Sequence, residues 1–66
     1  MKITLNGKEH ELAGPMSVSE LLEELGFAGK PVVVELNREP VFPRDHDQTR
    51  VEAAASVEIV ALAAGG

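Results

Sequence analysis

Residues 1–26, MKITLNGKEHELAGPMSVSELLEELG, decide the fold, because they predict a hairpin followed at once by a helix. In residues 1–6 apolar and polar side chains alternate, which is the period of a half-buried strand. Asn6-Gly7 predicts a tight type I′ turn, since both central positions of that turn need a positive φ. Residues 8–12 are therefore the predicted return strand.

The helix is predicted to begin after Ser17, which has the spacing of a capping box with Glu20. Four apolar residues then recur at i, i+3, i+4 and i+7 and form one apolar face: Val18, Leu21, Leu22 and Leu25. Gly26 predicts the end of the helix. Because so short a helix is marginal alone, we expect it to pack against a sheet.

The second half of the chain predicts further strands over residues 31–36, 40–42 and 57–62. Two prolines, Pro40 and Pro43, confine the middle segment to a sheet edge or an irregular ribbon. Residues 44–55 predict a loop with one short helical turn. In the last strand we expect three residues to face the core and three to face away from the helix. The first set is Val57, Ile59 and Ala61, and the second is Glu58, Val60 and Leu62.

This order of elements predicts an α+β protein of the β-grasp type, with a mixed sheet of four to five strands and one crossing helix. The first and last strands are expected to lie parallel at the centre, with the helix on one face. Residues 1–62 are predicted to form this domain, and residues 63–66 a flexible C-terminal tail.

The composition excludes several classes of function. The net charge of −5 argues against nucleic acid and favours a partner with a basic face. No apolar run approaches the length of a membrane span, so we expect a cytoplasmic protein without a membrane partner. The chain has no cysteine, which excludes disulfides and thiol chemistry of its own.

No residue set in the sequence predicts an active site. His10 is interpreted as a surface residue of a strand. Asp45-His46-Asp47 lacks further convergent ligands, so no metal site is expected. We therefore expect a protein acted on by partner enzymes, not an enzyme.

The last two residues, Gly65-Gly66, are the best candidate for a reactive group. A carboxylate reacts once another protein activates it as an acyl-adenylate or thioester. Glycine permits the backbone angles needed to thread a narrow channel. We therefore expect Gly66 to be the reactive residue and Ala64 and Gly65 to form the tail that carries it.

The strand before the tail predicts a docking surface for a partner. Val60 and Leu62 are aliphatic at positions where a purely structural sheet tends to carry polar residues. Val33 is expected to join them from the neighbouring strand, with Glu58 beside them.

Taken together, these segments resemble the ThiS family of sulfur carrier proteins. The similar segments span the whole chain: residues 1–7 (MKITLNG), 21–26 (LLEELG), 34–37 (VELN), 41–44 (VFPR), 57–60 (VEIV) and 65–66 (GG). Two positions depart from the family pattern. Ala55-Ser56 stands where a Gly-Asp pair is common, and Ala64 where many members have a further glycine.

The resemblance implies a ubiquitin-like β-grasp and a carrier cycle in thiamine thiazole synthesis. It implies a ThiF-like adenylyltransferase that uses ATP and magnesium to form an acyl-adenylate at Gly66. A persulfide donor then converts Gly66 to a thiocarboxylate, from which a ThiG-like thiazole synthase takes the sulfur. The chain itself is expected to hold no cofactor.

Three alternatives stay open at the level of sequence. The chain could be a sulfur carrier for another pathway, such as the small subunit of molybdopterin synthase. That family usually has a Pro-rich segment before its terminal glycines, which this chain lacks. It could be a ubiquitin-like modifier that is conjugated to lysines through Gly66. It could also be an interaction module without a reactive end.

Overall fold

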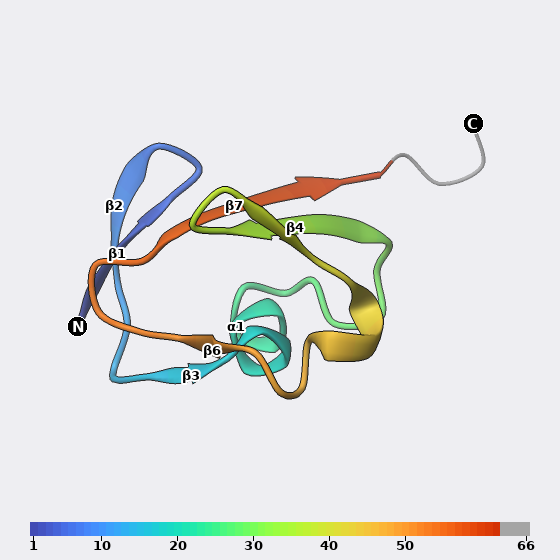
Figure 1. Ribbon diagram of the computed structural model, residues 1–66, viewed down its shortest axis with the longest axis horizontal. Helices are drawn as coiled ribbons and strands as arrows, with labels where there is room; N and C mark the ends of the chain where they lie inside the picture. The colour runs from blue at the N-terminus through green and yellow to red at the C-terminus, as the bar shows by residue number, and fades with distance from the viewer. Residues whose placement is uncertain (63–66) are drawn as a thin grey trace.

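The protein is built on a mixed five-stranded sheet with the order β2-β1-β7-β4-β5. A computed structural model describes residues 1–62. In chain order the elements are β1 (Lys2–Leu5), β2 (Lys8–Glu11), β3 (Met16–Ser17), α1 (Val18–Glu24), β4 (Val32–Leu36), β5 (Glu39–Val41), the 3-10 helix η1 (Pro43–Asp45), β6 (Arg50–Val51) and β7 (Ser56–Ala61). Strands β1 and β7 are parallel and the other neighbours antiparallel, so the predicted β-grasp is confirmed (Figure 1).

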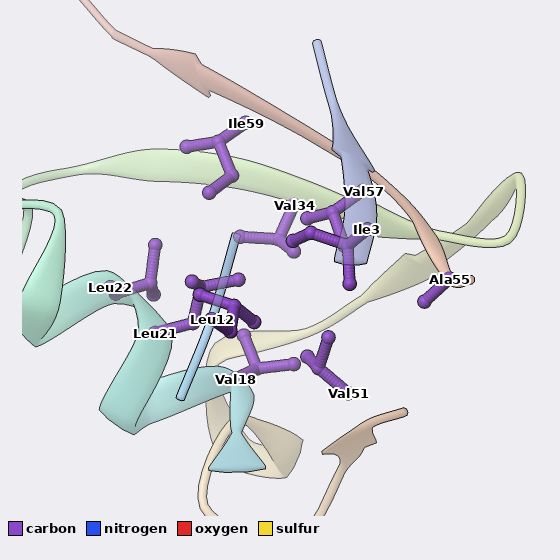
Figure 2. Close-up of a cluster of buried hydrophobic side chains, with 10 residues drawn as sticks. All are labelled: Ile3, Leu12, Val18, Leu21, Leu22, Val34, Val51, Ala55, Val57 and Ile59. Atoms are coloured by element: carbon purple, nitrogen blue, oxygen red, sulfur yellow. The ribbon is translucent and has the colours of Figure 1, made fainter. Parts of the chain in front are cut away.

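The core lies between one face of this sheet and helix α1 (Figure 2). The helix contributes its predicted apolar face, and Leu21 is completely buried. The ten buried apolar residues are Ile3, Leu12, Val18, Leu21, Leu22, Val34, Val51, Ala55, Val57 and Ile59. Most of them come from the alternate strand positions and helix positions that the sequence pattern indicates.

Two residues on the core side of the sheet differ in burial from what the sequence pattern predicts. Ala61 lies on the core side as predicted, since it pairs with the half-buried Val32, but it is exposed at the outer end of β7. His10 is half-buried instead of being a surface residue. It pairs with the buried Ile3, so it lies on the helix side of the sheet.

A second, two-stranded sheet of β3 and β6 was not predicted. Met16 pairs with Val51 and Ser17 with Arg50, in antiparallel register. The polar segment after η1 had been expected to be a loop, yet Val51 is fully buried. Strands of two residues are too short to show a sequence period, and they form here because distant segments meet beneath the sheet (Figure 1).

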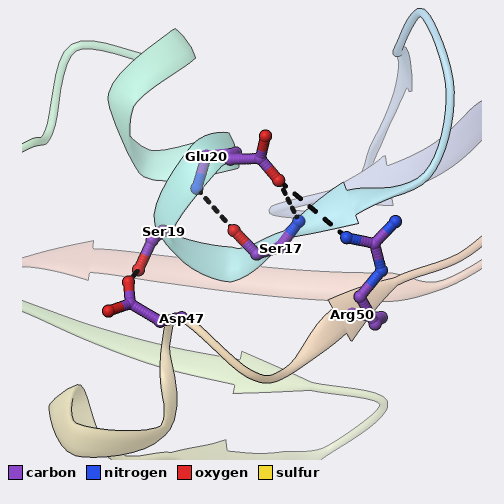
Figure 3. A network of polar contacts seen from close by, with 5 residues as sticks. All are labelled: Ser17, Ser19, Glu20, Asp47 and Arg50. Atoms are coloured by element: carbon purple, nitrogen blue, oxygen red, sulfur yellow. Dashed lines mark hydrogen bonds and ion pairs between the residues drawn. The ribbon is translucent and has the colours of Figure 1, made fainter.

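The predicted capping box begins α1 (Figure 3). The Ser17 hydroxyl accepts the Glu20 N–H at 3.0 Å, and the Glu20 carboxylate accepts the Ser17 N–H at 2.9 Å. The bonds from the Ser17 N–H and hydroxyl, aided by Arg50, lower the pKa of Glu20. Since the pKa is lower in the folded chain, Glu20 stabilises the fold at pH above its ordinary value of 4.5, and this stabilisation is lost as pH falls below that value.

The helix ends at Gly26 as predicted, and the structure shows that it does so through a Schellman motif. The Phe27 N–H donates to the Leu22 carbonyl at 2.7 Å, and the Gly26 N–H donates to the Glu23 carbonyl at 3.1 Å. Gly26 has a φ of +86°, which lies in the left-handed region. Ala54, in the turn before β7, has a φ of 66° without being glycine. This strained position lies one residue before the Ala55-Ser56 pair at which the sequence departs from the family pattern.

These two positions predict opposite effects of exchanging glycine and alanine. Gly26→Ala is expected to lower the free energy of unfolding by about 1 kcal/mol, because a left-handed backbone is costly for a residue with a Cβ. Ala54→Gly is expected to raise it by about 0.5 kcal/mol, since relief of strain outweighs the greater freedom of the unfolded chain. Urea unfolding measures both. Gly14→Ala is the control, because no positive φ occurs there and a Cβ has open space. Equal effects at the three positions would contradict this account.

Candidate functional site: the open face of the sheet

The sheet face that points away from α1, here called the open face, carries an apolar patch. Four large apolar side chains are exposed in the described part of the chain: Val33 at 47%, Phe42 at 53%, Val60 at 57% and Leu62 at 51%. Strand alternation explains why these four side chains are exposed. Each of them directly follows a residue whose side chain lies on the core side of the sheet. We call these four residues the apolar patch.

The strand register brings three members of the apolar patch together. Val60 of β7 lies directly opposite Val33 of β4. The Leu62 N–H donates to the Pro31 carbonyl at 2.9 Å, so pairing with the β4 side continues past the end of β7. Leu62 therefore follows Val60 on the same face. The structure thus places the predicted docking residues side by side, while their role stays a prediction.

Phe42 was not predicted to belong to this surface. Val41 pairs with Val34, and Phe42 has an extended backbone with φ −77° and ψ 151°. One further step of this register places Phe42 opposite Val33. The Arg44 guanidinium lies 5.4 Å from the ring centroid, within cation–π range. The sequence predicts that the segment with Phe42 lies at a sheet edge. Only the pairing of β4 with β5 shows which residue lies opposite Phe42.

An acidic pair borders the apolar patch. Glu58 of β7 lies directly opposite Glu35 of β4, and both side chains are exposed. Like charges in directly opposed strand positions are destabilising in the free protein. A cationic group of a partner would relieve this repulsion. The open face therefore combines exposed apolar area with two directly opposed carboxylates.

An open groove of about 430 Å³ lies at the end of the sheet where β7 stops. Leu22, Phe27 and Val32 give it an apolar lining, and Lys30 and His46 add polar groups. Leu62 borders both this groove and the apolar patch. Leu62, the last described residue, thus belongs to two surfaces that both carry apolar side chains.

The serine, histidine and aspartate residues near η1 do not form a catalytic arrangement. The Ser19 hydroxyl donates to the Asp47 carboxylate (Figure 3). His46 Nε2 lies 3.2 Å from the Val41 carbonyl oxygen and donates to it. These two hydrogen bonds, from Ser19 and from His46, therefore hold the turn after η1 in place. Among residues 1–62, no three His, Cys, Asp or Glu side chains are grouped so that they could hold a metal ion.

The predicted reactive tail, Ala64, Gly65 and Gly66, lies outside the described residues. Within the described residues, α1 spans seven residues, and no helix is long and apolar enough to cross a membrane.

Comparisons with known proteins agree with this geometry. The model of the ThiS family matches residues 3–66. A crystal structure of the thiamine biosynthesis protein ThiS from Geobacter metallireducens superposes with a TM-score of 0.86 at 36% identity, over all of both chains. A solution structure of a thiamine biosynthesis protein from the same organism gives a TM-score of 0.83 at 36% identity, over all of this chain and 88% of that one.

A curated relative, a thiazole synthase from Paramagnetospirillum magneticum, is 39% identical over 66 residues. That match covers all of this chain but 20% of the relative, so the chain spans about a fifth of the relative's length. Family match, fold and sequence identity point the same way: the chain belongs to the ThiS family.

Proposed function

We propose that this chain is a sulfur carrier for thiamine thiazole biosynthesis and that Gly66 is its attachment residue. The observation that carries the proposal is the extent of the family match, which runs through residue 66 and so includes Gly65-Gly66. The two similar Geobacter structures, both described as thiamine biosynthesis proteins, support the pathway.

The chemistry proceeds at the Gly66 carboxylate in two steps. A ThiF-like adenylyltransferase binds ATP and magnesium, and a carboxylate oxygen attacks the α-phosphorus with loss of pyrophosphate. The terminal sulfur of a persulfide then displaces AMP from the acyl-adenylate and forms a C–S bond, which gives an acyl disulfide. A thiol attacks the donor-side sulfur and breaks the S–S bond that came with the persulfide, leaving the thiocarboxylate and a disulfide on the donor. ATP and magnesium belong to the partner, and this chain supplies the acyl group.

The folded body serves as the part that partners recognise. The apolar patch offers the contact area, and the Glu35–Glu58 pair offers a site for a basic side chain. The Glu35–Glu58 pair and two residues of the apolar patch, Val33 and Val60, lie on β4 and β7, and β7 leads to the tail. An enzyme that binds the open face is therefore also close to the start of the C-terminal tail, which has to enter its active site.

A thiazole synthase of the ThiG class is the proposed sulfur acceptor. The support is the Paramagnetospirillum relative, a thiazole synthase in which a stretch similar to this chain makes up a fifth of a longer protein. In that relative, a carrier-like stretch and a thiazole synthase occur in one polypeptide. This arrangement is consistent with a carrier that delivers sulfur to a thiazole synthase.

Intact-mass spectrometry tests the proposal. After incubation with a ThiF-class enzyme, ATP, magnesium and a persulfide donor, the chain is expected to gain the mass difference between sulfur and oxygen. Fragmentation should place this gain at Gly66, and a variant lacking Gly66 should show none.

A matched reaction with the similar Geobacter carrier serves as the positive control. An unchanged mass here, with sulfur gained by that control, would refute the proposal. Isopeptide-linked products on lysines would favour the modifier. Transfer of sulfur to molybdopterin synthase in place of thiazole synthase would favour the other carrier pathway.

A further inference from the structure

Asn6 bonds to strand β7 through its side chain as well as its backbone. Its N–H donates to the Val57 carbonyl at 2.9 Å. Its Oδ1 accepts the Ile59 N–H at 2.8 Å, and its Nδ2 donates to the Ile59 carbonyl at 3.2 Å. One side-chain amide thus satisfies both backbone groups of a residue that is 53 positions away.

This amide replaces a strand residue that β1 does not have. The paired register of β1 and β7 ends at Leu5 and Val57. The chain then turns away at Asn6 and Gly7, with φ of 49° and 81°, to form β2. The N–H and C=O of Ile59 point toward the β1 side of the sheet, where β1 has already ended. The Asn6 side-chain amide binds both groups, as the next backbone peptide group of β1 would if the strand continued.

The two long sides of β7 are therefore held differently. On the β4 side, pairing continues through the bond from the Leu62 N–H to the Pro31 carbonyl. On the β1 side, the bonds from Asn6 to Ile59 are the last that hold β7 within the described residues. Removal of this amide would leave the outer half of β7 attached through β4 alone.

We propose that Asn6 is a positioning residue for the reaction at Gly66. By holding Ile59 from the β1 side, it keeps the outer half of β7 in one orientation relative to the rest of the sheet. Val60 of the apolar patch lies in this segment, and the chain continues from it toward Gly66, so the orientation sets where the tail begins relative to a docked partner. This inference rests on the proposed carrier function.

The identity of the residue matches both of its tasks. Asparagine tolerates the left-handed φ of the turn, and its amide carries one acceptor and one donor group at the spacing of a peptide. Glycine would keep the turn and lose both side-chain bonds. Aspartate would keep the acceptor for the Ile59 N–H but would turn a second oxygen, which cannot donate, toward the Ile59 carbonyl.

Asn37 provides a matched control at the opposite end of β7. It also has a left-handed backbone, with a φ of 51°. Its Oδ1 accepts the Ser56 N–H at 2.9 Å, and its N–H donates to the Ser56 carbonyl at 2.7 Å. Asn37→Gly therefore removes the same kind of bond from the same strand, far from the route to Gly66.

The experiment compares Asn6→Gly, Asn6→Asp and Asn37→Gly by steady-state adenylation with a ThiF-class enzyme and by amide exchange. For Asn6→Gly, kcat is expected to fall at least about tenfold with little change in KM, because docking persists while the acyl group is misplaced. Asn6→Asp should show a smaller fall. Asn37→Gly should leave both constants near those of the unaltered chain.

Amide exchange separates this inference from the proposed function. Exchange at Ile59 should quicken in Asn6→Gly and stay slow in Asn37→Gly, whether or not an enzyme is present. Unchanged exchange at Ile59, or equal falls in kcat for the two glycine variants, would overturn the positioning role. If the unaltered chain is not adenylated at all, the carrier function fails, and the exchange data alone decide whether Asn6 holds β7.

Discussion

Val60→Asp is expected to raise the KM for the activating enzyme at least about tenfold, because a carboxylate in a desolvated apolar contact is costly. Val60 is 57% exposed and lies directly opposite Val33, another member of the apolar patch. Its side chain contributes little to the core, so the fold should persist. The new charge would also lie on the same face of β7 as Glu58, two residues away, which adds repulsion within an already acidic face.

Steady-state adenylation kinetics and thermal unfolding together measure this effect. Ala53→Asp is the control, since it adds the same charge at an exposed turn position away from the open face. Leu62→Asp and Val33→Asp should resemble Val60→Asp if the apolar patch acts as one surface. A KM like that of the unaltered chain, or an equal rise for Ala53→Asp, would show that partners do not use this face.

Leu21→Ala is expected to lower the free energy of unfolding by about 3 kcal/mol, through lost apolar burial and the cavity left behind. Leu21 is completely buried on the face of α1 that packs against the sheet. In a domain of 66 residues the total stability is small, so this loss should leave the chain substantially unfolded at physiological temperature.

Urea unfolding of Leu21→Ala measures the loss. Glu24→Ala, on the exposed side of the same helix, is the control and should change the free energy of unfolding by no more than about 0.5 kcal/mol. Leu25→Ala should fall between the two, because Leu25 is half-buried. A loss below about 1 kcal/mol at Leu21 would mean that the core repacks around the missing atoms.

The two predictions reflect a division of the sheet between its faces. The face toward α1 holds the chain together, and the open face carries the four exposed apolar residues. Adjacent residues of β7, such as Ile59 and Val60, therefore serve different ends. Substitutions at the first are expected to act on stability, and substitutions at the second on partner recognition.

Local signals in the sequence were sufficient for most of the fold. The first hairpin, the capping box at Ser17 and the stop at Gly26 are all present as predicted. Each depends on interactions within a few residues, namely alternation, caps and turn geometry. Their order along the chain then limits the topology to few choices, and the β-grasp is among them.

The errors share a physical cause, which is that each depends on contacts between distant segments. The small sheet of β3 and β6 exists because Met16 meets Val51. Ala61 is exposed because its partner is the first residue of β4. Phe42 joins the apolar patch through the register of β4 and β5. No local pattern contains these pairings.

Asn6 shows most directly where sequence and tertiary structure divide. By itself the sequence determined that Asn6-Gly7 would turn the chain, since the preference for a positive φ is a property of those two residues. Only the tertiary structure decided that the same amide would hold Ile59. That second role required β1 to end where it does and β7 to lie beside it, because a hydrogen bond depends on distance in space and not on distance along the chain.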